Sequence, residues 1–513
     1  MKPQTAINSG SPLETGYALP TFTRYAILGL AALAILSWLL LAFAHLHDRY
    51  NVNAVSGTLL ALADRAREGV LYPPLFDGQS YGGTRTMPLP ILLYSFAISL
   101  GGDLLASAKV VDFLASAALL VLLVAVLRRL GATATMSVGL AATVVTSQVF
   151  LLVATGIRPE SLPTALQLGA LALVAFVPRR AATVLAAVVC AVAVLSKISA
   201  LWAPMTIVLW LMVYDRRRLL LFGTALAASM IVLLATFAVA TEGRMLSNLL
   251  GLGGAGLSVT GALKAPLKGI ELLAQYAQAT FVLLPVLLLG LLFVTRDARP
   301  TIFQIGLVGA TGILLVTMAD VGSDYNHLLD VIVLVPIVTL EVVRNLAHRV
   351  ADARLVWSFM TAAILVGSSA ALAVNAGSSL AATLQLPGAA QPASFDPNPF
   401  AAELRMADSV LSEDPYLNLS RGERPIVLDA FMFLRIANRD PGLVEPLLAR
   451  INDQGFDAIV LSKDLAHPEA VAWFRDFAFG LPFYEAMRDN YRLCSVIGGS
   501  FLYVANSGSC PNS

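Results

Sequence analysis

The chain has 513 residues, of which 57% are hydrophobic and only 13% are charged, and its formal net charge is +1. Soluble globular domains carry about 25% charged residues, so this composition excludes an ordinary soluble protein and predicts a polytopic helical membrane protein. The near-neutral charge also argues against a nucleic-acid partner.

The chain begins with a polar stretch, residues 1–25, that lacks the compact basic and then apolar order of a cleaved signal peptide. The next run, 26–46, is long enough to cross a bilayer. We therefore expect a cytoplasmic tail followed by a retained first transmembrane helix.

Apolar runs of a similar length recur along the chain. Together they predict eleven transmembrane helices, at 26–46, 107–127, 136–156, 161–177, 181–196, 200–214, 219–240, 278–295, 300–319, 328–343 and 356–375. A further run, 89–100, is too short to span and is expected to lie in the interface or to re-enter.

Arginine clusters set the predicted orientation. If 89–100 does not cross, the clusters at 128–129, 179–180 and 216–218 all fall on one side, together with the N-terminus. Because positive loops stay cytoplasmic, the N-terminus is predicted to be cytoplasmic and the C-terminus external.

This topology leaves two long external segments within a transmembrane domain, 26–375. The first, 47–106, contains an amphipathic helical pattern at 55–69. The second, 241–277, has a glycine-rich centre but lacks the GK[ST] ending of a phosphate-binding P-loop. We interpret the second segment as a flexible loop over a membrane-surface site.

Composition changes after the last predicted span. Residues 376–400 are small, polar and proline-bearing, as a linker would be, and 401–513 alternate between strand and helix patterns. The predicted strands are 425–431, 456–462, 493–498 and 500–506, and the clearest helix is 441–455. The tail is therefore expected to be a small external α/β domain, in which Cys494 and Cys510 could pair if the compartment is oxidising.

Polar residues gather at the predicted external ends of the helices, and Asp48 is the first of them. A partly buried carboxylate there can act as a general base toward a hydroxyl group. A solvated carboxylate at a helix end is the alternative, and His47 is a rival for the same role.

Three cations, Arg158, Lys197 and Lys264, are candidates for compensating the charge of a phosphate leaving group. Long basic side chains at a membrane interface also snorkel without any such role. Glu160 could orient Arg158, bind a metal or contact a sugar hydroxyl, and the sequence does not separate these roles.

The sequence GSDYNH precedes the predicted helix 328–343. Its Tyr325, Asn326 and His327 offer phenol, amide and imidazole groups that could hold a sugar. An ordinary polar turn is the alternative.

Several ordered motifs carry a resemblance to a known family. They are HDRYN around Asp48, GVLYPP at 69–74, PLPILLY at 88–94, RPE at 158–160 and GSDYNHLLD at 322–330. With these motifs, the chain resembles the integral-membrane glycosyltransferases of the C superfamily (GT-C), which include protein mannosyltransferases and aminoarabinose transferases.

The resemblance implies an inverting transferase that moves a sugar from a polyprenyl-phosphate donor to a hydroxyl of a cell-envelope glycan, lipid or protein at the outer face. It implies Asp48 as the base and cations near the lipid phosphate. The excess of arginine over lysine is consistent with a bacterial source, so we take a bacterial inner membrane as the default location, with the C-terminal domain in the periplasm; the endoplasmic reticulum is the alternative. The chain departs from the common pattern at Asp48, whose neighbours are His47 and Arg49, and at Glu160, where the family motif has Asp. No metal or other cofactor is predicted, and a metal requirement stays open.

Two other functions remain open on the sequence. A transporter or lipid flippase would carry polar residues through the bundle, usually with an internal repeat. A non-catalytic envelope assembly protein would use the external domain for binding alone.

Overall fold

The computed structural model describes residues 19–253, 257–292, 299–320, 322–350, 352–384, 396 and 398–510. The predicted tail, 1–25, therefore lies mostly outside the described residues. About half of the predicted linker, 376–400, also lies outside them, and its first residues, up to Thr383, are helical rather than linker-like. The chain forms two compact units, which we call the helical unit and the mixed unit and describe separately. The helical unit comprises Met1–Ala44, Asp112–Leu234 and Leu257–Ala390, and the mixed unit comprises His45–Val111, Ala235–Gly256 and Gln391–Ser513.

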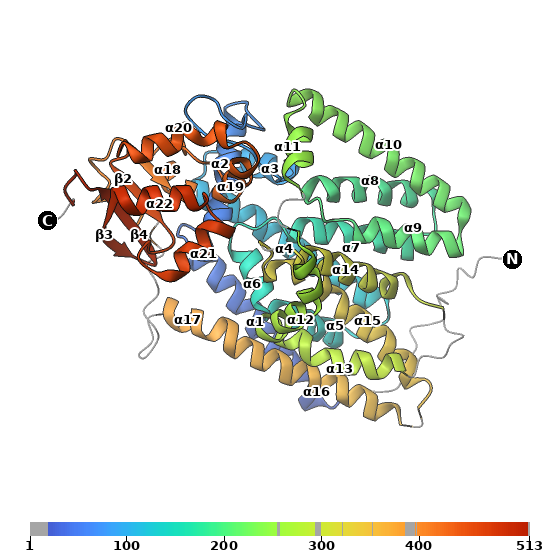
Figure 1. Ribbon diagram of the computed structural model, residues 1–513. Coiled ribbons are helices and arrows are strands. Elements are labelled where there is room, and N and C mark those ends of the chain that lie inside the picture. Colours follow the sequence, from blue (N-terminus) through green and yellow to red (C-terminus); the bar gives the residue numbers. More distant parts are fainter. Residues whose placement is uncertain are drawn as a thin grey trace. The chain divides into compact units, whose positions relative to one another are not determined.

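The helical unit is built from apolar helices that pack along one another, for example α7 on α8 and α13 on α16 (Figure 1). The helices that lie wholly or mainly in it are α1 (Thr21–Ala44), α4 (Leu104–Arg129), α5 (Ala134–Val145), α6 (Gln148–Thr155), α7 (Ser161–Phe176), α8 (Arg180–Ser196), α9 (Trp202–Tyr214), α10 (Arg216–Ala240), α12 (Val259–Tyr276), α13 (Gln278–Leu292), α14 (Ile302–Met318), η1 (Tyr325–Leu328), α15 (Leu329–Ala347), α16 (Ala353–Ala371), η2 (Leu372–Gly377) and α17 (Ser378–Thr383).

Among the described residues, five helical segments are long and apolar enough to cross a membrane, or up to seven if each of two bent pairs is one span. Each of the eleven predicted runs coincides with a helix or a bent pair, but several of these helices have only 10–17 residues. The protein is thus a multi-pass membrane protein, and the number of eleven crossings stays a prediction.

One bent pair shows how a broken helix is accommodated. The axes of α5 and α6 differ by 77° across the break. At this break the Asn375 amide, in the π-helical turn η2, donates to the Thr146 carbonyl at 2.9 Å and to the Gln278 side chain at 2.9 Å. Because lipid offers no hydrogen bonds, a broken helix in a bilayer needs such an internal partner.

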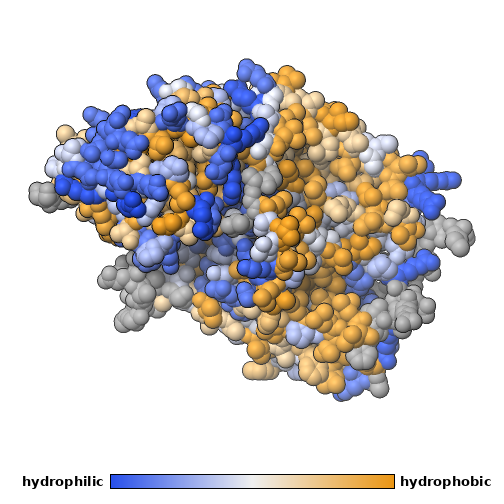
Figure 2. Space-filling view, in the orientation of Figure 1, coloured by the Kyte–Doolittle hydropathy of each residue, from blue (hydrophilic) through white to orange (hydrophobic). Residues whose placement is uncertain are grey.

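Large apolar side chains lie on the outer faces of the helical unit. Figure 2 shows hydrophobic side chains over α9 and α10, where Val213, Leu220 and Ile231 are among the exposed residues. A surface of this kind is expected where lipid tails surround a protein.

The mixed unit holds a four-stranded sheet flanked by helices. Its elements are α2 (Ala54–Arg67), α3 (Pro88–Ser99), α11 (Arg244–Leu252), β1 (Val410–Ser412), α18 (Pro415–Ser420), α19 (Ala430–Arg439), α20 (Pro441–Asn452), β2 (Ala458–Leu461), α21 (Pro468–Asp476), α22 (Leu481–Asn490), β3 (Tyr491–Ile497) and β4 (Ser500–Ala505). The sheet order is β1-β2-β4-β3, with β1 parallel to β2 and the other pairs antiparallel. The strands β2 to β4 and the helices α2 and α20 correspond to predicted elements.

One wrong prediction of local structure concerns a strand. Residues 425–431 are not a strand: Val427 makes only an isolated bridge to Tyr81. The helix α19 begins at Ala430 because the Asp429 side chain accepts hydrogen bonds from the backbone of Phe431 and Met432, both at 3.0 Å.

The segment 241–277 is also not a simple loop, because it contains α11 and α12. The α11 sequence buries Met245, Asn248 and Leu252 on one face, and Ser258 caps α12 through the Gly261 amide at 2.9 Å. The glycines at 251–256 interrupt the helical pattern in the sequence, which therefore predicts a loop. Part of the glycine-rich centre, 254–256, lies outside the described residues.

The sheet carries a covalent link. Cys494 in β3 forms a disulfide with Cys510, and Cys190 is a buried free thiol in α8. The pairing that the sequence left open is therefore present.

Candidate active site

A turn directly after α1 holds Asp48. The His45 Nδ1 lies 2.6 Å from Asp48 Oδ2, and the Tyr50 amide donates to Asp48 Oδ1 at 2.8 Å. Burial alone would raise the pKa of the Asp48 carboxyl, but the His45 and Tyr50 hydrogen bonds and nearby positive charge lower it below its ordinary value. The side chain is 28% exposed. Asp48 is thus an ionised carboxylate that solvent and ligands can reach.

Lys109 of α4 holds the backbone of this turn through hydrogen bonds. Its ammonium donates to the carbonyls of His45 at 2.6 Å, Asp48 at 2.8 Å and Tyr50 at 3.1 Å. An ammonium has three N–H donors, so these carbonyls use all of them. Lys109 is 2% exposed and therefore acts on the backbone that carries Asp48.

The structure separates His47 from Asp48. The His47 ring is 72% exposed and its Nδ1 lies 2.9 Å from Asp103 Oδ2. The histidine that contacts Asp48 is His45, which stacks on Tyr50 with ring centroids 4.3 Å apart.

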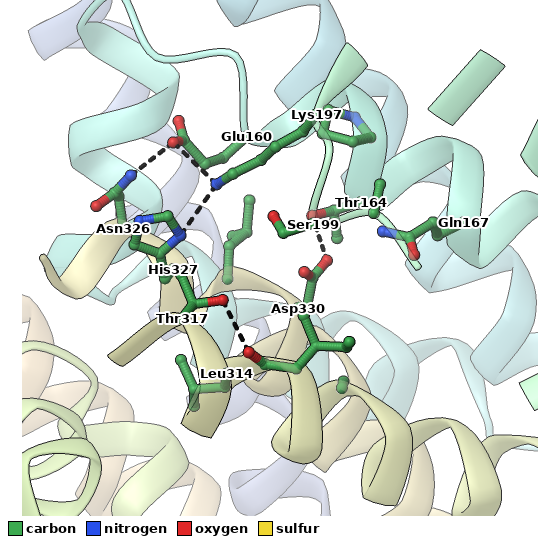
Figure 3. Close-up of a pocket in the computed structure, with 15 residues that line it drawn as sticks. Glu160, Thr164, Gln167, Lys197, Ser199, Leu314, Thr317, Asn326, His327 and Asp330 are labelled. Atoms are coloured by element: carbon green, nitrogen blue, oxygen red, sulfur yellow. Dashed lines mark hydrogen bonds and ion pairs between the residues drawn. The ribbon is translucent and has the colours of Figure 1, made fainter. Parts of the chain in front are cut away.

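In the helical unit, four of the predicted site residues form one cluster (Figure 3). Lys197 lies between Glu160 and His327: its Nζ is 3.2 Å from Glu160 Oε1 and 3.2 Å from His327 Nδ1. The Asn326 amide donates to the same Glu160 oxygen at 2.5 Å. The loops before α7 and α9 and the short helix η1 supply these groups.

Electrostatics favour the ionised form of Glu160. Burial alone would raise the pKa of its carboxyl, but the charges of Lys197, Arg158 and His327 together with the Asn326 amide bring it well below the usual range. The cluster therefore carries a carboxylate and adjacent positive charge at neutral pH.

Two buried polar atoms at or beside this cluster, Arg158 Nε and Glu160 Oε2, have no hydrogen-bond partner among the residues that the structure describes. The Arg158 backbone is held by Asp112 of α4, whose Oδ2 accepts from the Arg158 amide at 2.7 Å. A buried donor and a buried acceptor without partners are costly unless a ligand satisfies them.

Tyr325 and Lys264 lie apart from these hydrogen bonds. The Tyr325 ring stacks on Tyr276, with centroids 4.0 Å apart. Lys264 is exposed on α12. One turn later, Lys268 donates to the Ser323 carbonyl at 2.8 Å and so contacts the loop that leads into η1.

Asp330 of α15 extends the cluster, and the sequence did not single it out for the site. It accepts a hydrogen bond from the Thr164 hydroxyl at 2.6 Å and lines the same small pocket as Glu160 and Lys197 (Figure 3). Asp330, Lys109 and Asp112 are ionisable residues at the edge of or within predicted spans. Ionisable groups are rare in apolar helices and usually have a function, so their positions in the sequence are the signal that could have identified these three residues.

The side chains offer little for a metal ion. Within the described residues, no group of three or more His, Cys, Asp or Glu side chains is arranged to hold one.

Comparison with known proteins identifies the fold. No protein-family model and no curated sequence matches the chain. The structure of ArnT from Cupriavidus metallidurans bound to undecaprenyl phosphate is similar, with a TM-score of 0.57 and 12% identity over 94% of this chain and 99% of that one. The apo form of the same protein gives a TM-score of 0.60, with 12% identity over 94% and 98% of the two chains. The oligosaccharyltransferase of Archaeoglobus fulgidus, in complex with Zn and sulfate, gives 0.52, with 13% identity over 94% and 73%. The chain therefore has the fold of the GT-C glycosyltransferases, as the sequence motifs predicted.

Proposed function

We propose that this protein is an inverting glycosyltransferase that takes a sugar from a polyprenyl-phosphate donor and places it on a hydroxyl of a cell-envelope glycan, lipid or protein. The fold supports the reaction class. The similar ArnT structure contains undecaprenyl phosphate, which is the kind of lipid that such a donor would leave behind.

The observation that carries the proposal is the pair Arg158 Nε and Glu160 Oε2, for which the described part of the chain supplies no hydrogen-bond partner. A phosphate oxygen would accept from the guanidinium, and a sugar hydroxyl would donate to the carboxylate. A glycosyl phosphate carries both kinds of group, so one ligand would satisfy both residues. Lys197 adds positive charge, and negative charge builds on the phosphate as its bond to the sugar breaks.

In the proposed reaction, the acceptor oxygen attacks the anomeric carbon while the bond from that carbon to the phosphate oxygen breaks. The leaving polyprenyl phosphate keeps the electron pair, and the anomeric configuration inverts. Asp48 takes the proton of the acceptor hydroxyl. Its lowered pKa keeps the carboxylate ready to accept that proton at neutral pH.

The substrate roles of the remaining groups follow the same logic. We assign Tyr325 and Asn326 to the sugar and Lys264 to the approach of the lipid phosphate. The reaction is proposed at the periplasmic face of a bacterial inner membrane, with the N-terminus cytoplasmic. The disulfide between Cys494 and Cys510 supports this orientation, because disulfides persist in the periplasm and are rare in the cytosol.

The test is release of free lipid phosphate from a panel of polyprenyl-phosphate sugars by the purified protein. Replacement of Asp48 by Asn removes the proton acceptor but keeps the shape, so transfer should fall by about 10²- to 10⁴-fold with unchanged expression. The matched control is His47→Gln, which alters an exposed neighbour and should transfer at the wild-type rate.

A fully active Asp48→Asn enzyme would contradict the assignment of the base. Folded wild-type protein that releases lipid phosphate from no donor, while it exchanges lipid or solute across vesicles, would instead support the transporter alternative.

A further inference from the structure

The mixed unit contains a second feature that the proposed reaction does not use. An open cleft with a volume of about 430 Å³ lies among the loop 76–81, the start of β1 and the helix α20. Ligand pockets typically measure about 300–1,000 Å³. We propose that this cleft binds an uncharged sugar unit of an oligosaccharide, which on the proposed function is part of the acceptor.

The first wall of the cleft is a rigid loop. Asp77 Oδ1 accepts from the amides of Gln79 at 3.0 Å and Ser80 at 2.7 Å, which fixes the tip of the loop. The Tyr81 amide donates to the Ile426 carbonyl at 2.7 Å and so ties the base of the loop to the cleft floor. A preformed wall loses little conformational entropy when a ligand binds.

An aromatic pair belongs to this wall. Phe76 stacks on Tyr81 with centroids 4.5 Å apart, and Tyr81 meets Phe433 edge to face at 5.0 Å. Both Phe76 and Tyr81 line the cleft, and because Tyr81 is buried, the half-buried Phe76 is the ring that a ligand can reach. Aromatic side chains combine an apolar face with a fixed shape, which suits the C–H face of a sugar ring.

The opposite wall supplies hydrogen-bonding groups. Arg450 of α20 donates to the Ser409 hydroxyl and lies over the Phe456 ring at 4.1 Å, so its guanidinium is held in place. Asn418 is 2% exposed, and its amide donates to the Val410 carbonyl at 3.0 Å. A few fixed polar groups in a cleft are what set the orientation of a bound ligand.

The positive and negative side chains that line the cleft are equal in number. Two guanidinium groups, of Arg424 and Arg450, and two carboxylates, of Asp408 and Glu423, line it. Because neither sign is in excess, the cleft offers no net attraction to a phosphorylated or acidic sugar. A neutral glycan, whose hydroxyls both donate and accept, matches this lining.

The experiment measures binding of a panel of neutral trisaccharides, built from glucose, mannose, galactose or N-acetylglucosamine, to the full-length protein in nanodiscs. Saturation-transfer NMR gives the affinity. Wild type should bind at least one of them. The double variant Gln79→Trp and Arg424→Ala, which narrows the cleft and removes one donor, should bind it at least about tenfold more weakly, since each 1.4 kcal/mol is a factor of ten.

The matched control is Arg475→Ala, which removes an arginine whose side chain is 58% exposed and which pairs with Asp476 away from the cleft. It should bind as wild type does. No binding by wild type, or equal binding by the double variant, would overturn the proposal.

Failure here can be told apart from failure of the proposed function. Trisaccharide binding without release of lipid phosphate would leave the cleft assignment standing and remove the transferase. Release of lipid phosphate with no trisaccharide binding would leave the transferase standing and remove the cleft assignment.

Discussion

The hydrogen bond between His45 and Asp48 makes the pH dependence of the reaction testable at the scale of one residue. Below its pKa, Asp48 is protonated and cannot accept a proton, so the rate falls toward acid. Because the His45 bond helps to lower that pKa, His45→Phe should raise it and move the acid limb of the pH–rate profile to higher pH. Phenylalanine keeps an aromatic ring to stack on Tyr50.

The measurement is kcat/KM from pH 4 to pH 8 for wild type and His45→Phe. An unchanged acid limb would mean that the Asp48 carboxyl does not set it. If activity disappears in His45→Phe at every pH while Asp48→Asn stays active, the imidazole would be the base and Asp48 its positioning partner.

Lys109 offers a second test at this scale. In Lys109→Met the three carbonyls of the turn lose their donor, so the turn that carries Asp48 should loosen. We expect kcat to fall by about 10²-fold, as misplacement of a reacting group by about 1 Å can do, while donor KM changes little. A loss in KM alone would instead assign Lys109 to substrate binding.

At the scale of elements, one ion pair links the loop before α7 to the end of α8. Lys197→Met leaves the Glu160 carboxylate buried without its main counter-charge, which should cost about 3–5 kcal/mol of stability. The pKa of Glu160 is lowered on folding, so the stabilisation is present at neutral pH and is lost only when the pH falls below the usual range of a glutamate.

Thermal unfolding in detergent measures this effect. The double variant Glu160→Gln and Lys197→Met removes both charges and should recover part of the loss, as a double-mutant cycle would report. Additive effects of the two substitutions would show that the pair is not coupled.

The helix α12 provides a matched pair of lysines. Lys268→Ala removes the bond to the Ser323 carbonyl that holds the loop before Tyr325, so donor KM should rise about fivefold, the effect of losing about 1 kcal/mol. Lys264→Ala changes an exposed residue, and a larger effect there than at Lys268 would favour a direct phosphate role for Lys264.

Most helices are readable from the sequence, whereas the contacts of the candidate site are not. The lengths of the apolar runs predicted the helices well, because the length and composition of a run are local properties of the sequence. The helices within 241–277 were missed because glycine signals masked a short amphipathic pattern. The Asp48 motif was readable, whereas its contacts with His45 and Lys109 were not. Lys109 lies 61 residues from Asp48 in the chain, and only tertiary packing brings it there.

At the scale of the whole molecule, the disulfide tests orientation. If the C-terminus is periplasmic, Cys494 and Cys510 should be oxidised in the cell and Cys190 should be the free thiol. Denatured, unreduced protein should then take up one thiol-reactive polyethylene glycol group, and reduced protein should take up three, since the chain has three cysteines. Labelling of all three without reduction would place the tail in a reducing compartment.

The amide of Asn375 has a consequence for how the protein is made. It donates a hydrogen bond to the Thr146 carbonyl at the break between α5 and α6, yet Asn375 is synthesised 229 residues after Thr146. During translation the Thr146 carbonyl therefore lacks this partner, and it depends on the insertion machinery or on water until α16 and the turn that follows it have been synthesised. We expect nascent chains that stop before α16 to be retained by that machinery or degraded, so that biogenesis is completed from the C-terminal end of the membrane region.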